Sequence, residues 1–76
     1  MVEFFSFRKY TIVIHVDRLD FDCGPALFRA TATIETPERR PIDRLIGKME
    51  ESEAEARSAV LIRAQCEVES FTAPQC

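Results

Sequence analysis

A chain of 76 residues that is 46% hydrophobic and 30% charged has the composition of a small folded domain and not of a disordered segment. A domain of this size buries only about 60% of the surface that its unfolded chain exposes, so its stability margin is small. The net charge of -3 disfavours general nucleic-acid binding, which needs several basic side chains along a phosphate track. We therefore expect a single domain over residues 1–76 that makes no sequence-specific contact with nucleic acid.

The N-terminal segment MVEFFSF is apolar but lacks the positively charged start and the long apolar run of a secretory signal. No apolar run approaches the roughly 20 residues that span a bilayer. Cys23, Cys66 and Cys76 match no zinc-site or redox spacing, and their odd number leaves one unpaired. We expect a cytoplasmic protein in a reducing compartment, with Cys66 as a small buried side chain.

Residues 9–19 alternate between more and less apolar side chains, which is the pattern of a half-buried strand. Their high content of β-branched residues also favours the extended conformation. The more apolar face of this strand consists of Tyr10, Ile12, Ile14 and Val16.

Residues 20–25 contain Gly24 and Pro25 beside two aspartates, which predicts a turn. Alternation returns over residues 26–36 and predicts a second strand, antiparallel to the first. Ala30 and Ala32 lie in the middle of its apolar face, where their small side chains leave room for a helix. The remaining members of this apolar face are Phe28 and Ile34.

Two interpretations remain open after Pro41. In the first, Pro41 is the first residue of one long helix, because Ile42, Leu45, Ile46 and Met49 have helical spacing. In the second, residues 42–49 form a third strand or a short helix that ends at Gly47. Both interpretations contain a helix over about 52–65, with Ser52 and Glu55 as a capping pair at its start in the second.

Alternation over residues 66–72 predicts a short final strand, and residues 73–76 are expected to fray. The predicted fold class is therefore α+β: an antiparallel sheet, formed by the hairpin 9–19/26–36 and the C-terminal strand, packs against one main helix.

No motif indicates catalysis. The one histidine, His15, lies in mid-strand on the less apolar face, and no nucleophile or carboxylate stands at a spacing that favours a catalytic assembly. Metal ligation needs paired ligands at short spacing, and Gly24 and Gly47 stand alone, so no phosphate-binding loop is predicted. We expect no catalytic, cofactor or metal site, and no enzymatic activity.

Three groups of side chains are candidate partner-binding sites. An acidic cluster either imitates a nucleic-acid backbone or keeps a helix start soluble. A basic cluster either contacts phosphates or an acidic protein surface, or is simply solvated. An aromatic segment near the N-terminus has side chains of both strand parities, so both of its faces are hard to bury in so small a domain. The acidic cluster is Glu50, Glu51, Glu53 and Glu55; the basic cluster is Arg39, Arg40 and Arg44; the aromatic segment is Phe4, Phe5 and Phe7.

In size, acidity and order of elements over Tyr10 to Phe71, the chain resembles several small phage-encoded anti-CRISPR proteins. This resemblance implies a non-enzymatic inhibitor that binds a bacterial nucleoprotein defence complex and blocks nucleic-acid access or nuclease recruitment. Two alternatives stay open. One is a HicB-type antitoxin that masks an RNA-cleaving toxin. The other is a homodimerising module, in which the aromatic segment or the free edge of residues 10–16 pairs with a second copy.

Overall fold

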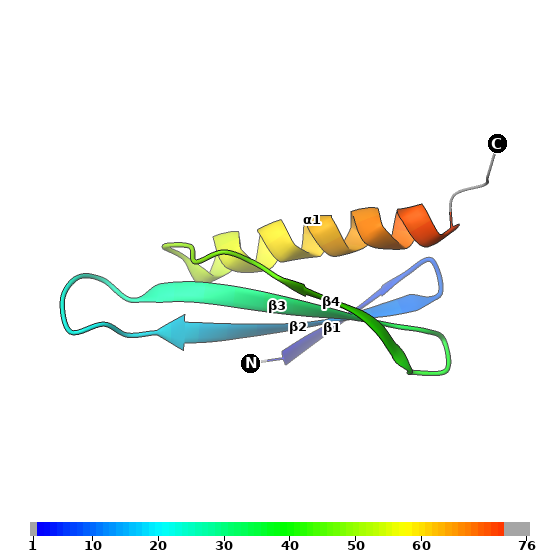
Figure 1. Ribbon diagram of the computed structural model, residues 1–76, viewed down its shortest axis with the longest axis horizontal. Helices are drawn as coiled ribbons and strands as arrows, with labels where there is room; N and C mark the ends of the chain where they lie inside the picture. Colours follow the sequence, from blue (N-terminus) through cyan, green and yellow to red (C-terminus); the bar gives the residue numbers. More distant parts are fainter. Residues whose placement is uncertain (1, 73–76) are drawn as a thin grey trace.

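The computed structural model describes residues 2–72, which form an antiparallel four-stranded sheet followed by one long helix (Figure 1). The strands follow one another in the sheet in the order in which they occur along the chain. The α+β fold class is therefore confirmed. The expected tail at 73–76, which includes Cys76, lies outside the described residues. The elements are β1 (Val2–Phe7), β2 (Tyr10–Leu19), β3 (Leu27–Glu35), β4 (Pro41–Ile46) and α1 (Glu53–Thr72).

The central hairpin of the sheet is the one that the alternating pattern predicts. β2 and β3 pair along their whole length, with Ile14 opposite Ala32 and Ile12 opposite Ile34. These four side chains are fully buried beneath the helix. The loop that joins the strands includes Gly24 at a φ of 92°, a left-handed conformation that glycine adopts without steric cost.

β1 is an additional strand that the sequence analysis did not assign. It pairs with β2 through a two-residue turn, in which Arg8 and Lys9 have φ angles of 51° and 73°. Both faces of β1 carry phenylalanine, so its sequence lacks the apolar and polar alternation that identifies β2 and β3. A strand at the edge of the sheet tolerates this pattern because the helix covers only part of it.

For residues 42–49 the strand interpretation is correct for the first part, and the long helix starting at Pro41 is wrong. β4 pairs with β3 in an antiparallel register, with Leu45 opposite Ala32 and Arg44 opposite Thr33. The register shifts at Ile34 and Glu35, next to Pro41. Apolar residues of helical spacing misled the first interpretation, since alternate positions of β4 point to opposite faces of the sheet.

The predicted C-terminal strand over 66–72 is wrong, because α1 continues to Thr72. Val68 is the reason: it follows Ala64 by four residues and continues the buried stripe of the helix. Cys66, which was expected to be buried, lies beside this stripe and is exposed.

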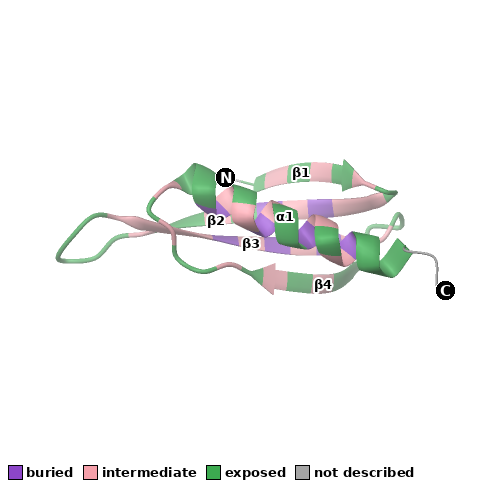
Figure 2. Cartoon of the chain, turned by 90° about the horizontal axis from the view of Figure 1, so that it is seen from above, coloured by how far each residue is buried: buried purple, intermediate pink, exposed green. Residues whose placement is uncertain are grey.

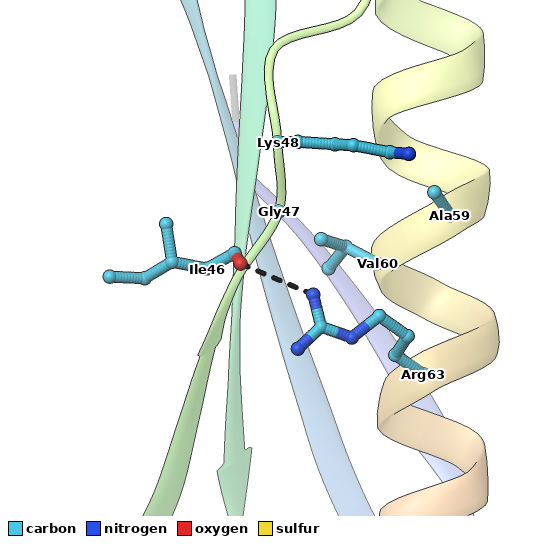
Figure 3. Close-up of a pocket in the computed structure, with 6 residues that line it drawn as sticks. All are labelled: Ile46, Gly47, Lys48, Ala59, Val60 and Arg63. Carbon is cyan, nitrogen blue, oxygen red and sulfur yellow. Dashed lines mark hydrogen bonds between the residues drawn. The ribbon is translucent and has the colours of Figure 1, made fainter.

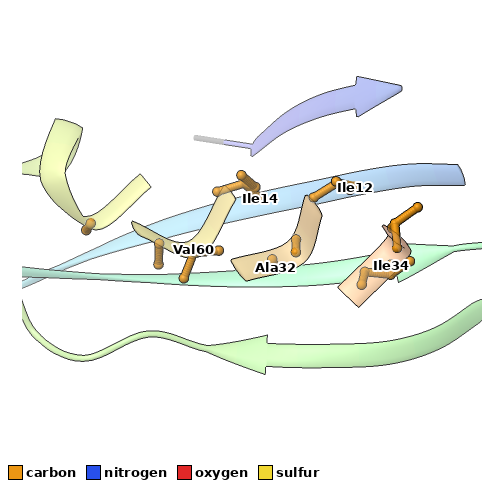
Figure 4. Packing of buried hydrophobic residues seen from close by; sticks show 9 residues of the cluster. Ile12, Ile14, Ala32, Ile34 and Val60 are labelled. Atoms are coloured by element: carbon orange, nitrogen blue, oxygen red, sulfur yellow. The ribbon is translucent and has the colours of Figure 1, made fainter. Parts of the chain in front are cut away.

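The core lies between the helix and the two central strands (Figures 2 and 4). Ala30 and Ala32 are fully buried, and their small side chains let α1 lie close to β3, as expected from the sequence. Burial of each isoleucine or valine contributes roughly 1.5–3 kcal/mol, and such side chains supply most of the driving force in a domain of this size. The buried residues are Ile12, Ile14, Ala30, Ala32, Ile34, Ala56, Val60, Ala64 and Val68.

Candidate interaction surface

The helix covers one face of the sheet, and among residues 2–72 no element covers the opposite face (Figure 1). We call the opposite face the open face. Because neighbours along a strand point to opposite sides, the open face is formed by the residues that alternate with the core positions. It consists of Val2, Phe4, Ser6, Thr11, Val13, His15, Asp17, Arg29, Thr31, Thr33, Glu35, Ile42, Arg44 and Ile46.

Cross-strand pairing arranges these side chains in rows. One row runs Val2, His15, Thr31, Ile46, and the next runs Phe4, Val13, Thr33, Arg44. Side chains that stand directly opposite each other in an antiparallel pair lie about 4.5–5.5 Å apart at Cβ, so each row forms a continuous strip across the sheet.

Large apolar side chains are exposed at both edges of the open face. On β1, Val2 and Phe4 keep 46% and 61% of their surface exposed. On β4, Ile42 and Ile46 keep 45% and 58%. A domain with a small core gains nothing from leaving four such side chains in water on one face, so this surface is a candidate for contact with another molecule.

The middle of the open face is polar and slightly hollowed. Nε2 of His15 lies 2.8 Å from Oδ1 of Asp17, with both side chains about half exposed. The Arg44 guanidinium forms no ion pair with any carboxylate of residues 2–72. These three side chains line a depression of ≈ 330 Å³ together with Val2, Val13, Thr31 and Thr33. The hollow therefore offers hydroxyl groups, an imidazole paired with a carboxylate, and, on the β4 side, one guanidinium that pairs with no carboxylate of residues 2–72.

Arg39 of the basic cluster also reaches the open face. Its Nε donates a hydrogen bond of 2.8 Å to Oε1 of Glu35, and its guanidinium lies 5.7 Å from the centre of the Phe4 ring. A cation over an aromatic face contributes about 0.5–1 kcal/mol at an exposed site. Arg39 thus helps to fix Phe4 in an exposed position.

The acidic and basic clusters lie at different ends of the molecule, whose longest dimension is 50 Å (Figure 1). The turns β1–β2 and β3–β4 are at one end of the sheet, with Arg8 and Lys9 in the first and Arg39 and Arg40 in the second. The loop β2–β3 and the start of α1 are at the other end, where the acidic cluster lies. The two clusters therefore do not form one site. Arg44 is separated from the other two arginines and belongs to the open face.

The acidic cluster has a clear structural role at the helix start. Ser52 is the cap: its Oγ accepts a hydrogen bond of 3.1 Å from the backbone N–H of Glu55. Glu53 and Glu55 lie in the first turn, where carboxylates interact favourably with the helix dipole. Glu50 is half-buried, and its backbone forms hydrogen bonds of 2.8 and 2.7 Å with the backbone of Phe28.

The aromatic segment is split between the two faces of β1. Phe4 lies on the open face, whereas Phe5 and Phe7 lie on the helix side and pack partly against the core. Glu3, also on the helix side, accepts a hydrogen bond of 2.8 Å from Nη1 of Arg57. This contact with Glu3 raises the pKa of Arg57 above its ordinary value.

A second depression, of ≈ 370 Å³, lies between the end of β4 and the helix (Figure 3). Arg63 crosses it and donates a hydrogen bond of 3.2 Å from Nη1 to the carbonyl oxygen of Ile46. Gly47, Lys48, Ala59 and Val60 complete its wall. Lys48 carries the only amine among these residues, and none of them supplies a hydroxyl, thiol, imidazole or carboxylate that could act with it. The depression therefore belongs to the packing of α1 against β4.

Residues 2–72 contain no group of three or more His, Cys, Asp or Glu side chains placed to hold a metal ion. In the same range no helix is long and apolar enough to cross a membrane. No protein-family model, curated protein or solved structure matches the chain.

Sequence reasoning identified Phe4 and Arg44 as candidate contacts but missed Val2, Ile42 and Ile46. Their signal is strand parity: each lies on the face opposite the core positions of its strand. That signal becomes readable only after β1 and β4 are recognised as strands.

Proposed function

We propose that this chain is a non-enzymatic protein-binding domain whose contact surface is the open face of its sheet. The observation that carries the proposal is the exposure of Phe4 and Ile46, at 61% and 58%, on opposite margins of one face. Protein interfaces combine aromatic and aliphatic anchors with arginine. Arg44 lies on β4 between Ile42 and Ile46, in the same row as Phe4.

The side chains of the open face indicate the chemical character of the surface that would bind to it. The unpaired Arg44 guanidinium and the Thr31 and Thr33 hydroxyls suit a carboxylate or another hydrogen-bond acceptor. The apolar margins suit aliphatic or aromatic side chains on both sides of that acceptor. We therefore propose a partner surface with an acidic centre and apolar flanks.

Two single substitutions of matched exposure test this proposal. Ile46→Asp changes the open face at a side chain that is 58% exposed, and Ile62→Asp changes the outer side of the helix at 60% exposure. Tagged protein is used to capture partners from a bacterial lysate, with mass spectrometry as the readout. We expect Ile46→Asp to lose the partner that the parent and Ile62→Asp both retain. Retention by Ile46→Asp together with loss by Ile62→Asp would assign the contact to the helix instead.

The finer form of the proposal is an inhibitor that binds a bacterial nucleoprotein defence complex and blocks nucleic-acid access or nuclease recruitment. The resemblance to small anti-CRISPR proteins supports it, and so do the exposed Glu51, Glu53 and Glu55 at one end of the molecule. These carboxylates would take the place of phosphates toward a basic partner. The triple substitution to lysine is expected to weaken such binding, and unchanged affinity would remove this form of the proposal. The HicB-type antitoxin and the homodimerising module remain the alternatives. Residues 10–16 are not a free edge, because β1 and β3 flank β2 on its two sides.

A further inference from the structure

We infer that β1 pairs with β1 of a second copy of the chain, in an antiparallel arrangement with the two-fold axis at Phe5. This pairing joins the two four-stranded sheets into one and places both helices on the same side. It involves the edge of the sheet and is independent of the open-face contact proposed above.

The two edges of the sheet differ in their protection against pairing. The β4 edge begins with Pro41, has a register shift beside it, and carries Asp43 and Arg44 within its length. Arg63 of the helix also donates a hydrogen bond to the carbonyl oxygen of Ile46, so this acceptor of the β4 edge already has a partner. Proline, irregular register and charged side chains are the usual means by which an edge strand avoids adding another strand.

The β1 edge has none of these features over Val2–Phe7. Its six residues pair with β2 in an unbroken register and include no proline. Glu3 is the only charged residue of the strand, and its carboxylate is already paired with Arg57. No strand of residues 2–72 lies beyond β1, so its outer backbone groups face solvent. Such an edge is a template for a further strand.

The helix leaves the side chains of β1 incompletely covered. α1 packs on β2, β3 and β4, and Figure 2 shows β1 lying beyond the helix along much of its length. Phe5 and Phe7 point to the helix side but remain only half-buried. A second copy placed edge to edge brings its own Phe5 and Phe7 to the same side. The four rings then fill the space between the two helices.

The residues of β1 select both the partner and the register. When a strand pairs with its own copy and keeps the two helices on one side, the two-fold axis lies at one residue. An axis at Glu3 sets two carboxylates directly opposite each other, which is unfavourable. An axis at Phe4 sets Glu3 against the other Phe5. That pair stands directly beside the axis. An axis at Phe5 pairs the two Phe5 rings and sets Phe4 opposite Ser6. Each Glu3 then faces Phe7 of the copy at the end of the paired segment, beside its own helix start, where solvent reaches the carboxylate.

The oligomeric state tests the pairing. Val2→Lys/Phe4→Lys places two lysines on the β1 edge, and Ile42→Lys/Ile46→Lys is its matched control on the β4 edge. Both changes replace two exposed apolar side chains of the open face. Sedimentation equilibrium of the full chain is expected to give a concentration-dependent dimer for the parent and the control, and a monomer for the β1 variant. The inference would be overturned by a monomeric parent, by a β1 variant that still forms the dimer, or by a β4 control that does not.

Cysteine cross-linking tests the register. In a background where Cys23, Cys66 and Cys76 are replaced by serine, Phe5→Cys brings two thiols opposite each other across the axis. Phe7→Cys, on the same side of β1, faces Glu3 of the copy. Mild oxidation is expected to give a covalent dimer with Phe5→Cys and not with Phe7→Cys. The reverse result, or no cross-link in either variant, would refute the register. Loss of partner capture by Ile46→Asp bears on the open face alone, so the two proposals fail separately.

Discussion

A Cβ atom on Gly47 would lie 2.7 Å from Cγ2 of Val60 and 3.2 Å from the carbonyl oxygen of Ala30. The backbone N–H of Gly47 donates a hydrogen bond of 2.9 Å to that same oxygen. At Gly47 the linker from β4 to α1 therefore lies beside β3 and so close to Val60 of the helix that there is no room for a Cβ atom. The absence of a side chain at Gly47 therefore lets the linker lie against β3 and Val60 of the helix at the same time.

We predict that Gly47→Ala destabilises the domain by about 1–3 kcal/mol, because the added methyl group forces the helix or the linker to move. Urea unfolding followed by circular dichroism measures the change. Lys48→Ala, at the exposed neighbouring position, is the control and is expected to leave the midpoint unchanged. Equal midpoints for Gly47→Ala and the parent would show that the helix can shift without cost.

The β1–β2 turn is predicted to be a site of stored strain. Arg8 and Lys9 both have positive φ angles, and such a conformation costs an L-residue roughly 1–2 kcal/mol. Asn-Gly is the favoured pair in two-residue turns of this kind. Arg8→Asn/Lys9→Gly should therefore raise the melting temperature. Glu38→Gly is the control, since Glu38 lies in the β3–β4 turn and, unlike its neighbour Arg39, has no positive φ angle. It should not raise the melting temperature, and a gain of the same size there would argue against local strain as the cause.

The helix cap is predicted to be worth about 1 kcal/mol, since Ser52→Ala removes the acceptor for the N–H of Glu55. Ser58→Ala, at an exposed position within the helix, is the matched control. Thermal unfolding should show a lower melting temperature for the first variant only. Equal melting temperatures for the two variants would mean that water satisfies the N–H of Glu55 as well as the Ser52 hydroxyl does.

The assignment of the two faces of the sheet predicts opposite responses to the same chemical change. Ile14→Asp places a carboxylate in the core without a partner and costs several kcal/mol, enough to unfold a domain with a small stability margin. Ile46→Asp places the same group on the open face, where it is solvated. Far-ultraviolet circular dichroism should show an unfolded chain for Ile14→Asp and a native spectrum for Ile46→Asp. A folded Ile14→Asp variant would contradict the assignment of the core.

The central hairpin and its core face could be predicted from the sequence because β2 and β3 bury one side and expose the other. β1 could not, since Phe4 and Phe5 are neighbours and give no alternation. Residues 42–49 were ambiguous because Ile42, Leu45 and Ile46 fit both a helix and a strand. Pairing with β3, a contact distant in sequence, decides the outcome.

The helix end was misjudged for a related reason. Cys66, Val68 and Ser70 alternate with the glutamates at 67 and 69, which resembles the pattern of a strand. Of residues 66–72, however, only Val68 is buried in the core, four residues after Ala64. The candidate surface depended on these same elements. Phe4 and Arg44 were candidates in the sequence, whereas Val2, Ile42 and Ile46 became apparent only when β1 and β4 were placed at the two edges of one sheet.

Site-specific photo-cross-linking tests the central claim, that the open face binds a protein, most directly. Benzoylphenylalanine is introduced in place of Ile46 on the open face or in place of Ile62 on the outer side of the helix, at 58% and 60% exposure. After irradiation in a bacterial lysate, we predict a defined adduct with another protein from the Ile46 position and none from the Ile62 position. An adduct from the Ile62 position alone would contradict the claim and move the contact surface to the helix.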